Sequence, residues 1–410
     1  MSERAPLLNR QPQHAAHQVT VVSSLAALWN NNLWFNVFGL VFIPLGIISS
    51  AYGWSDGSVF ALNCLAIIPL AKMLDFATDQ LAMRTNETIG GLLNATFGNA
   101  VELILSIMAL KEGLLHVVQA SMIGSILSNL LLVLGFCFLC GGLFPFQFNK
   151  FQEFDADKAN VSTGLLSLTF LGFLVPCVLR FELPKTVETE KTIVNLSRGI
   201  SVVLLIIYVS YLVFQLYTNP DGLKVTPKRR VDPETPEATS AEDNEEEEEE
   251  PETLLWIALA ALAGSTLIIA FSAELLVGSI EGLSKQAGIS ETFIGIIILP
   301  IVGNAAEHVT AVSSAMRNKM DLSIQVAVGS SHQIALMVTP AVVLFGWFLD
   351  KDMNLDFGAF STAVLLVSTL VVNALIQDGR THWFEGEMLI GAYIIIAVGY
   401  YFVPDPTAHF

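Results

Sequence analysis

Long apolar stretches separated by short polar connections make up most of this 410-residue chain. Eleven of them contain about 20 mainly apolar residues, the length that a helix needs to cross the hydrocarbon core of a bilayer. Helices of a soluble protein would carry Lys, Glu and Arg along one face at helical spacing, and these stretches do not. We therefore expect an all-α polytopic membrane protein with eleven transmembrane helices, near 33–52, 58–80, 88–110, 116–141, 161–181, 197–217, 254–278, 291–314, 321–347, 357–377 and 386–403.

Composition supports this reading, because 53% of the residues are hydrophobic and only 14% are charged, against about 25% charged in typical soluble domains. The net charge of −18 is concentrated in one place. Residues 219–252 contain thirteen acidic and four basic residues, a net of −9, which is half of the total. Their Pro, Glu and Thr content cannot support a packed core. We interpret them as an acidic cytosolic linker, and we expect no nucleic-acid partner.

Two segments of the chain repeat each other. Residues 88–102 read TIGGLLNATFGNAVE and residues 293–307 read FIGIIILPIVGNAAE, so that two Gly-Asn-Ala-x-Glu motifs lie 205 residues apart. Two further matches keep the same order along the chain: Gly124-Ser125 with Gly329-Ser330, and Phe76-x-x-Asp79-x-Leu81 with Phe271-x-x-Glu274-x-Leu276. Three ordered matches indicate an internal repeat.

Positive residues indicate the orientation of the two halves. With a cytosolic N-terminus, twelve Lys and Arg residues fall in cytosolic connections and seven in those of the far side, as the positive-inside rule favours. The third span then runs outward and the eighth inward, which is the inverted-repeat architecture of secondary transporters. We predict the following organisation: N-terminal tail 1–32, first transmembrane helix 33–57, first five-helix repeat 58–218, linker 219–252, second five-helix repeat 253–403, and C-terminal tail 404–410.

The repeated glutamates, Glu102 and Glu307, fall inside apolar spans. A charged carboxylate at the bilayer centre costs at least ~2.5 kcal/mol, and two in matching contexts indicate a cation site. Ca²⁺ takes about 6–8 oxygen ligands, and two glutamates balance its charge. Neutral oxygens come from Asn99, Asn304 and backbone freed near Gly98 and Gly303, where Pro300 also favours local unwinding.

The same carboxylates offer a place for protons, so cation and protons would compete for one site. A third proton would need another acid, either Asp79 or Glu274, which are equally well read as helix-end carboxylates. The polar residues Ser125, Ser128, Ser330, Gln333 and His332 are candidates for proton transfer or gating, or for hydrogen bonds between helices alone. Mn²⁺ and Na⁺ are also compatible with these ligands, whereas no Cys and His cluster favours Zn²⁺.

The paired motifs, together with GSILSNL at 124–130 and GSSHQIA at 329–335, resemble the cation/proton exchanger family of the cation/Ca²⁺ antiporter superfamily. The resemblance is close to the vacuolar Ca²⁺/H⁺ exchangers of fungi and plants. It implies antiport of cytosolic Ca²⁺ against protons of an acidic vacuolar lumen, with Glu102 and Glu307 binding either ion. It also implies a proton or gating role for Asp79 and Glu274. His332 departs from the family pattern, in which an apolar residue is expected.

Alternatives are a Na⁺-coupled Ca²⁺ exchanger and a passive cation channel. An intramembrane enzyme would need a nucleophile with its base, and the sequence offers neither. Glu3 to Leu8 resemble an acidic dileucine sorting signal, in keeping with a multi-pass protein of the vacuolar membrane. We expect membrane lipid, Ca²⁺ and H⁺ as partners and no resident cofactor, and the sequence leaves homo-oligomerisation open.

Overall fold

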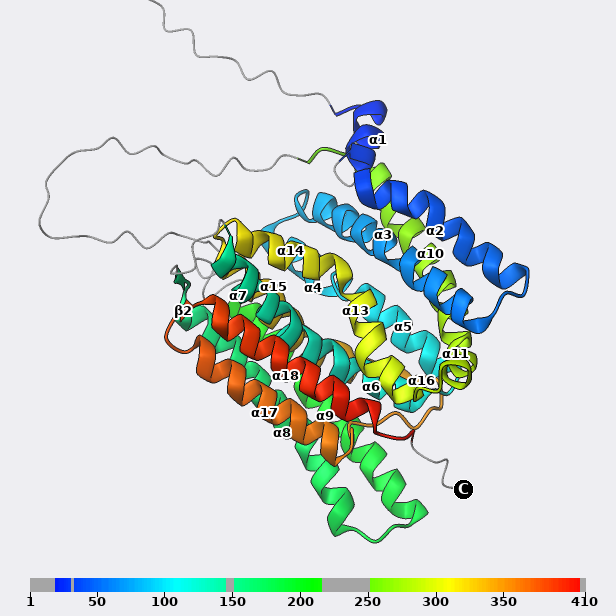
Figure 1. The fold of residues 1–410 in the computed structure, drawn as a ribbon, viewed down its shortest axis with the longest axis vertical. Helices are drawn as coiled ribbons and strands as arrows, with labels where there is room; N and C mark the ends of the chain where they lie inside the picture. The colour runs from blue at the N-terminus through cyan, green and yellow to red at the C-terminus, as the bar shows by residue number, and fades with distance from the viewer. Residues whose placement is uncertain (1–18, 31–32, 145–150, 216–250, 406–410) are drawn as a thin grey trace, which may run out of the picture.

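The computed structural model describes residues 19–30, 33–144, 151–215 and 251–405, which are nearly all helical (Figure 1). The first half contains α1 (Val21–Asn30), α2 (Leu33–Ala51), α3 (Asp56–Ala82), α4 (Glu87–Phe97), α5 (Ala100–Lys111), α6 (Leu115–Leu127), the π-helix η1 (Ser128–Val133), α7 (Leu134–Leu143), strand β1 (Gln152–Glu153), α8 (Ala156–Glu182) and α9 (Val187–Val213). The second half contains α10 (Leu255–Gly278), α11 (Ile280–Ala287), α12 (Glu291–Phe293), the π-helix η4 (Ile294–Ile298), α13 (Leu299–Gly303), α14 (Ala305–Met316), α15 (Met320–Gln333), the π-helix η5 (Ile334–Val338), α16 (Thr339–Phe348), α17 (Ala359–Ile376), strand β2 (Arg380–Thr381) and α18 (Trp383–Tyr401).

Nine helices of the described ranges are long and apolar enough to cross a membrane, or ten if the bent pair 280–287 and 291–303 forms one span. They coincide with nine of the eleven predicted stretches. One boundary was wrong: the sixth stretch was expected to begin near 197, whereas α9 begins at Val187. Thr186 caps this helix and polar residues fill its first turns, so apolar content alone underestimated its length.

The two stretches that carry the glutamate motifs, 88–110 and 291–314, are not continuous helices. The first is broken between α4 and α5, where Asn99 has φ −107° and ψ 19°. The second is broken between α13 and α14, where Asn304 has φ −95° and ψ 10°. The two breaks lie 205 residues apart, as the motifs do. The local unwinding expected from Gly-Asn is therefore confirmed at both places.

A close helix crossing depends on Gly124. A Cβ atom at Gly124 would collide with the carbonyl oxygen of Ile296 and the ring of Pro300. The absence of a side chain therefore lets α6 pack against η4 and α13. In this way the first half of the chain contacts the second half directly beside its broken helix.

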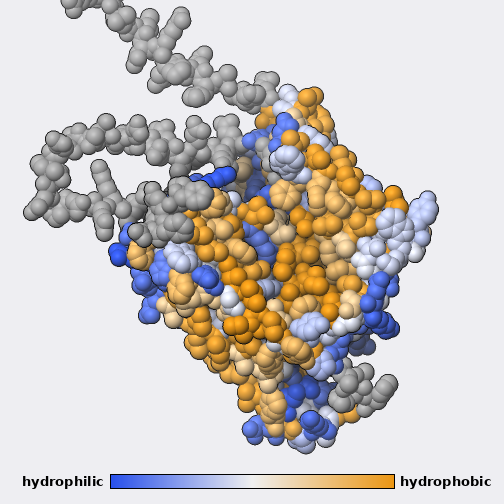
Figure 2. Space-filling view, viewed as in Figure 1, coloured by the Kyte–Doolittle hydropathy of each residue, from blue (hydrophilic) through white to orange (hydrophobic). Residues whose placement is uncertain are grey.

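The core lies along two long helical segments. In the most apolar windows of Leu115–Leu143 and Met320–Phe348, 78% and 67% of the residues are buried, against 22% in α2 and in α18. Around them, α2, α3 and α10 pack together on one side, and α8, α9, α17 and α18 lie on the other (Figure 1). Figure 2 shows a broad apolar surface on this face, with hydrophilic residues toward its edges and lower tip, as a lipid-facing helical bundle requires.

Parts of both predicted tails belong to the described residues and make contacts with the helices. Within the expected N-terminal tail, α1 is fixed because the Ser24 hydroxyl accepts a hydrogen bond from the Leu254 amide (2.9 Å). In the expected C-terminal tail, the Asp405 carboxylate accepts bonds from the amides of Glu291 (2.9 Å) and Thr292 (2.8 Å). Most of the predicted linker, 219–252, lies outside the described residues. At its end, the amide of Glu252 donates to the Gln80 side chain (2.8 Å).

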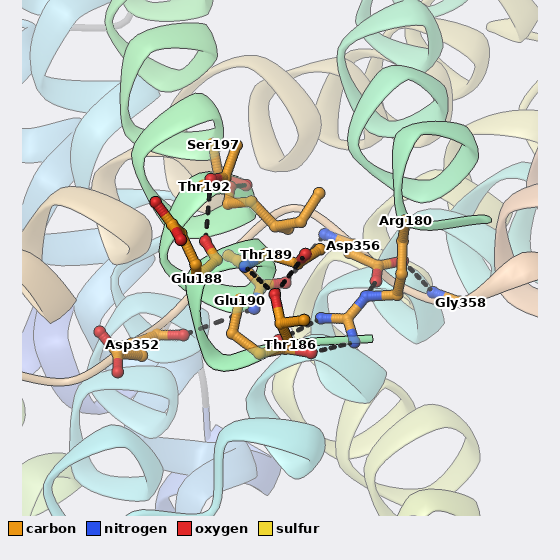
Figure 3. A network of polar contacts seen from close by, with 12 residues as sticks. Arg180, Thr186, Glu188, Thr189, Glu190, Thr192, Ser197, Asp352, Asp356 and Gly358 are labelled. Carbon is orange, nitrogen blue, oxygen red and sulfur yellow. Dashed lines mark hydrogen bonds and ion pairs between the residues drawn. The ribbon is translucent and has the colours of Figure 1, made fainter. Parts of the chain in front are cut away.

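A polar network joins three elements at one end of the bundle (Figure 3). Arg180, at the end of α8, donates two hydrogen bonds to the Glu190 carboxylate of α9 (2.8 and 2.6 Å). Arg180 also pairs with Asp356 in the loop between α16 and α17, and the Asp356 side chain is only 6% exposed. In the same loop, the Leu355 amide donates to the Ser197 hydroxyl (3.0 Å). The α8–α9 hairpin is thereby tied to the connection that follows α16.

We predict that Arg180→Met destabilises the fold, because it leaves the buried Asp356 carboxylate without its guanidinium partner. The Arg180 side chain is 36% exposed, so screening by solvent reduces the effect, and we expect a loss of about 1–2 kcal/mol. Thermal unfolding of the detergent-solubilised protein measures it as a lower melting temperature. Lys285→Met is the matched control, because Lys285 pairs with Glu281 on the exposed surface. Equal melting temperatures for the two variants would contradict this role of Arg180.

Candidate cation-binding site

Both repeated glutamates occupy the first turn of a helix that follows a break. Glu102 lies in the first turn of α5, and Glu307 lies in the first turn of α14. The Glu102 side chain points at the other motif, because a Cβ atom at Gly303 would lie 3.2 Å from its Oε1. The charges of Glu102 and Glu307 are close enough to interact. The two motifs, separated by 205 residues, therefore meet at one place.

The asparagines of the two motifs link each break to the opposite half of the chain. The side-chain amide of Asn99 donates to the side-chain oxygen Oε1 of Gln333 in α15 (2.6 Å). The Asn304 amide donates to the Ser125 hydroxyl of α6 (3.3 Å) and to the Pro300 carbonyl (3.0 Å). With both amide groups used as donors to protein, the breaks are held in a defined orientation.

Oxygen atoms at this junction are available to a cation. Among the described residues, Oδ1 of Asn304 and Oε2 of Glu307 are buried without a hydrogen-bond partner. A buried acceptor without a partner is costly, and a hard cation satisfies it. Ser330 lies within hydrogen-bonding reach of Glu307. The residues present thus fit an oxygen-liganded ion such as Ca²⁺.

A cavity of about 440 Å³ leads to this junction. At the junction it is lined by Glu307, Gly98, Ser330 and Gln333. It also extends along the C-terminal part of α3 and the end of α9. The residues that line it there are Lys72, Asp75, Asp79, Tyr211 and Gln215. The site therefore has a polar path along one side of α3.

Most of the predicted site residues gather here. Glu307, Gly98, Ser330, Gln333, His332 and Asp79 line the cavity, and Glu102, Asn99, Asn304, Gly303, Ser125 and Ser128 are buried beside it or in the helices that form it. Glu274 is the exception: it lies exposed on α10, outside the cavity lining. The buried face of α10 is formed instead by neighbours such as Ser272, Ala273 and Leu276. The proton or gating role expected of Glu274 stays a prediction.

His332 is buried, with 3% of its surface exposed, and its ring packs edge-on against Tyr211 at 5.1 Å. Across the described ranges, no group of three or more His, Cys, Asp or Glu side chains is close enough to hold a metal ion. Any ion between Glu102 and Glu307 would therefore draw on amide, hydroxyl or backbone oxygens as well.

Two charged residues of the cavity were not among the predicted site residues. Lys72 and Asp75 both line it, and their side chains form an ion pair at 3.9 Å. A signal for them exists in the sequence, because Lys72, Asp75 and Asp79 are spaced three and four residues apart, which places them on one helix face. Lys72 and Asp75 lie within a predicted span, where charged groups are rare and functional.

A family model described as sodium/calcium exchanger protein matches residues 57–217 and 257–402. The chain therefore belongs to the sodium/calcium exchanger protein family. It is 42% identical over 406 residues to the vacuolar calcium ion transporter of Schizosaccharomyces pombe, covering 98% of this chain and 94% of that protein. It is also 42% identical over 409 residues to vacuolar cation/proton exchanger 2 of Arabidopsis thaliana, covering 99% and 90%.

The fold matches a solved structure as well. Native YfkE superposes with a TM-score of 0.74 at 36% identity, covering 90% of this chain and 100% of that one. The resemblance to cation/proton exchangers that the paired motifs indicated is confirmed by these similarities. The relatives are named as transporters and exchangers, in agreement with a protein that is not an enzyme.

We predict that Gly303→Val weakens cation binding at least tenfold, because the valine methyl groups would occupy the space beside Oε1 of Glu102. Gly303→Ala should give a smaller loss, since a Cβ at 3.2 Å requires the carboxylate to shift only slightly. Binding of ⁴⁵Ca²⁺ to the purified protein measures both. Gly264→Ala is the control, because a Cβ there meets nothing within 4 Å. Unchanged binding in Gly303→Val would show that the ion does not sit between the two motifs.

Proposed function

We propose that this chain is a secondary active antiporter that exchanges Ca²⁺ for protons. The observation that carries the proposal is the meeting of the two motifs. There the Glu102 carboxylate faces Gly303, and the buried atoms Oδ1 of Asn304 and Oε2 of Glu307 have no hydrogen-bond partner. The names of the relatives, vacuolar calcium ion transporter and cation/proton exchanger, support the choice of ions.

Charge balance gives the exchange its physical basis. Two neighbouring carboxylates inside the protein, with Glu102 buried and Glu307 partly buried at the cavity, are costly to keep ionised without a counter-charge. One Ca²⁺ neutralises both, and so do two protons, one on each of Glu102 and Glu307. Ca²⁺ and protons therefore exclude each other, and each ion leaves when the other arrives.

The transport cycle requires that the site reach each side of the membrane in turn. In our proposal the eleven spans form one N-terminal helix and a 5+5 inverted repeat, with the broken third and eighth spans crossing at the midplane. The N-terminus faces the cytosol, and the cavity along α3 is the cytosolic path to the site. Rocking of one five-helix repeat against the other would close this path and open one on the far side.

The cellular setting follows from the relatives. Two of them are named vacuolar, and we place this chain in the vacuolar membrane, moving Ca²⁺ out of the cytosol into an acidic lumen. Mn²⁺ is a second cargo, since its oxygen ligands are the same as those of Ca²⁺. No resident cofactor is needed, because the proton gradient supplies the driving force.

We predict that Glu102→Gln and Glu307→Gln each abolish Ca²⁺ uptake driven by a pH gradient, because an amide can neither balance the cation charge nor carry the proton. The measurement is ⁴⁵Ca²⁺ uptake into acid-loaded proteoliposomes. Glu281→Gln is the control, because Glu281 lies on the exposed surface paired with Lys285. Uptake at the wild-type rate in either site variant, with correct folding, would sink the assignment.

The coupling ion is tested separately. With Na⁺ absent, we expect an uncoupler that collapses the proton gradient to stop ⁴⁵Ca²⁺ uptake, and we expect unlabelled Mn²⁺ to compete. Uptake that persists without the proton gradient but needs a Na⁺ gradient would indicate a Na⁺-coupled exchanger. Uptake that follows membrane potential alone would indicate a channel.

A further inference from the structure

Lys72 and Asp75 form a charged pair inside the cavity that leads to the two glutamates. Both residues belong to α3 and both line the cavity together with Glu307. The ammonium and the carboxylate are 3.9 Å apart, and the side chains are 27% and 25% exposed. A lysine and an aspartate within a membrane-spanning helix are costly, and their cavity-facing position indicates that they act on the ion path.

Asp75 lies one turn of α3 further from the helix end than Asp79, and both line the same cavity as Glu307. A cation that enters past the end of α3 and moves along the cavity would therefore meet Asp75 before it reaches the two glutamates. Lys72 is the positive charge that it would have to displace.

The pair has no counterpart in the other half of the chain. At the offset of 195 residues that relates Asp79 to Glu274, Lys72 corresponds to Leu267 and Asp75 to Ala270. Leu267 is 71% exposed on α10. The repeated glutamates thus occur in both halves of the chain, whereas the Lys72–Asp75 pair occurs only in the first half.

We infer that Asp75 binds the incoming divalent cation before the cation reaches the two glutamates. We also infer that the Lys72 ammonium competes with cations for the Asp75 carboxylate, so that only a divalent cation displaces it. The inference rests on the proposed Ca²⁺/H⁺ exchange. The ammonium of Lys72 is covalently held beside Asp75, so its effective concentration there is high. A monovalent cation carries no more charge than the ammonium and does not displace it. A divalent cation interacts about twice as strongly with the carboxylate, and takes its place.

This arrangement predicts opposite effects for the two residues. Lys72→Met removes the competitor, so the KM for Ca²⁺ should fall several-fold, and added K⁺ or Na⁺ should become a competitive inhibitor. Asp75→Asn removes the ligand, so the KM should rise about tenfold, or ~1.4 kcal/mol, with the maximal rate within about twofold of wild type. Both are measured as ⁴⁵Ca²⁺ uptake into acid-loaded proteoliposomes over a range of Ca²⁺ and K⁺ concentrations.

The double variant separates this role from a structural one. If Lys72 acts through Asp75, then Lys72→Met has no further effect on KM or on K⁺ inhibition when Asp75→Asn is present. Lys72→Arg keeps the charge and should keep K⁺ without effect. Lys285→Met is the matched control, since it removes the lysine of an exposed pair on α11. If Lys72→Met does not fold, Lys72→Gln and Lys72→Arg provide the same comparison.

Three results would overturn the inference: no K⁺ inhibition in Lys72→Met, an equal effect of Lys72→Met in both backgrounds, or an Asp75→Asn variant with reduced maximal rate and unchanged KM. Its failure is distinguishable from that of the proposed function. Wild-type protein without proton-driven uptake would refute the exchange itself. In that case, equilibrium ⁴⁵Ca²⁺ binding in detergent, with K⁺ as competitor, still decides whether Lys72 and Asp75 select for divalent charge.

Discussion

Two neighbouring carboxylates inside the protein, which share one counter-charge in the exchange that we propose, are the constraint on which the rest of this structure depends. Glu102 and Glu307 lie on different halves of the chain, yet the first reaches the glycine of the second motif. Charge at this depth is tolerated only where the protein supplies compensation. The helix breaks, the small residues and the amide groups around them are the means by which the fold brings this compensation to one place.

Irregular backbone inside a membrane protein needs partners from the protein itself, because lipid offers no hydrogen bonds. At the breaks the backbone partners come from neighbouring turns of the same half, since the Leu103 amide donates to the Asn99 carbonyl and the Asn304 amide donates to the Pro300 carbonyl. The side chains of Asn99 and Asn304 donate instead to Gln333 and Ser125 of the opposite half. The helices that supply them, α6 and α15, both pass into π-helical segments, a local geometry that is frequent at functional sites. Each break is therefore supported by a helix that is itself irregular, so a shift of one half alters the hydrogen bonds of the other.

The sequence predicted the membrane spans and the broken helices of this protein better than the orientation of single polar side chains. Nine spans, the meeting of the two motifs and the unwinding beside them could be predicted, since they depend on apolar length and on Gly-Asn pairs. The positions of Glu274 and Asp75 could not, because an internal repeat says which residues correspond and not which helix face packs inward. Asp79 lines the cavity while its counterpart Glu274 lies exposed on α10. Asp75 lies within an apolar stretch and was not predicted as a site residue. Its position in the cavity depends on how α3 is rotated about its axis relative to the neighbouring helices.

The two halves of this chain match at the two motifs and differ along the cavity that leads to them. The glutamates and asparagines recur in both halves, as the proposed cation site requires if one cation takes ligands from both. Pro300 has Ala95 at the matching position of the first half, and the Lys72–Asp75 pair has no charged match in the second. An exchanger meets different ion concentrations on the two sides of the membrane. Identical access paths would give the same selectivity between ions on both sides. In the exchange that we propose, a shared site with unlike paths would let the same groups hold Ca²⁺ and protons, while the protein discriminates between ions on one face only.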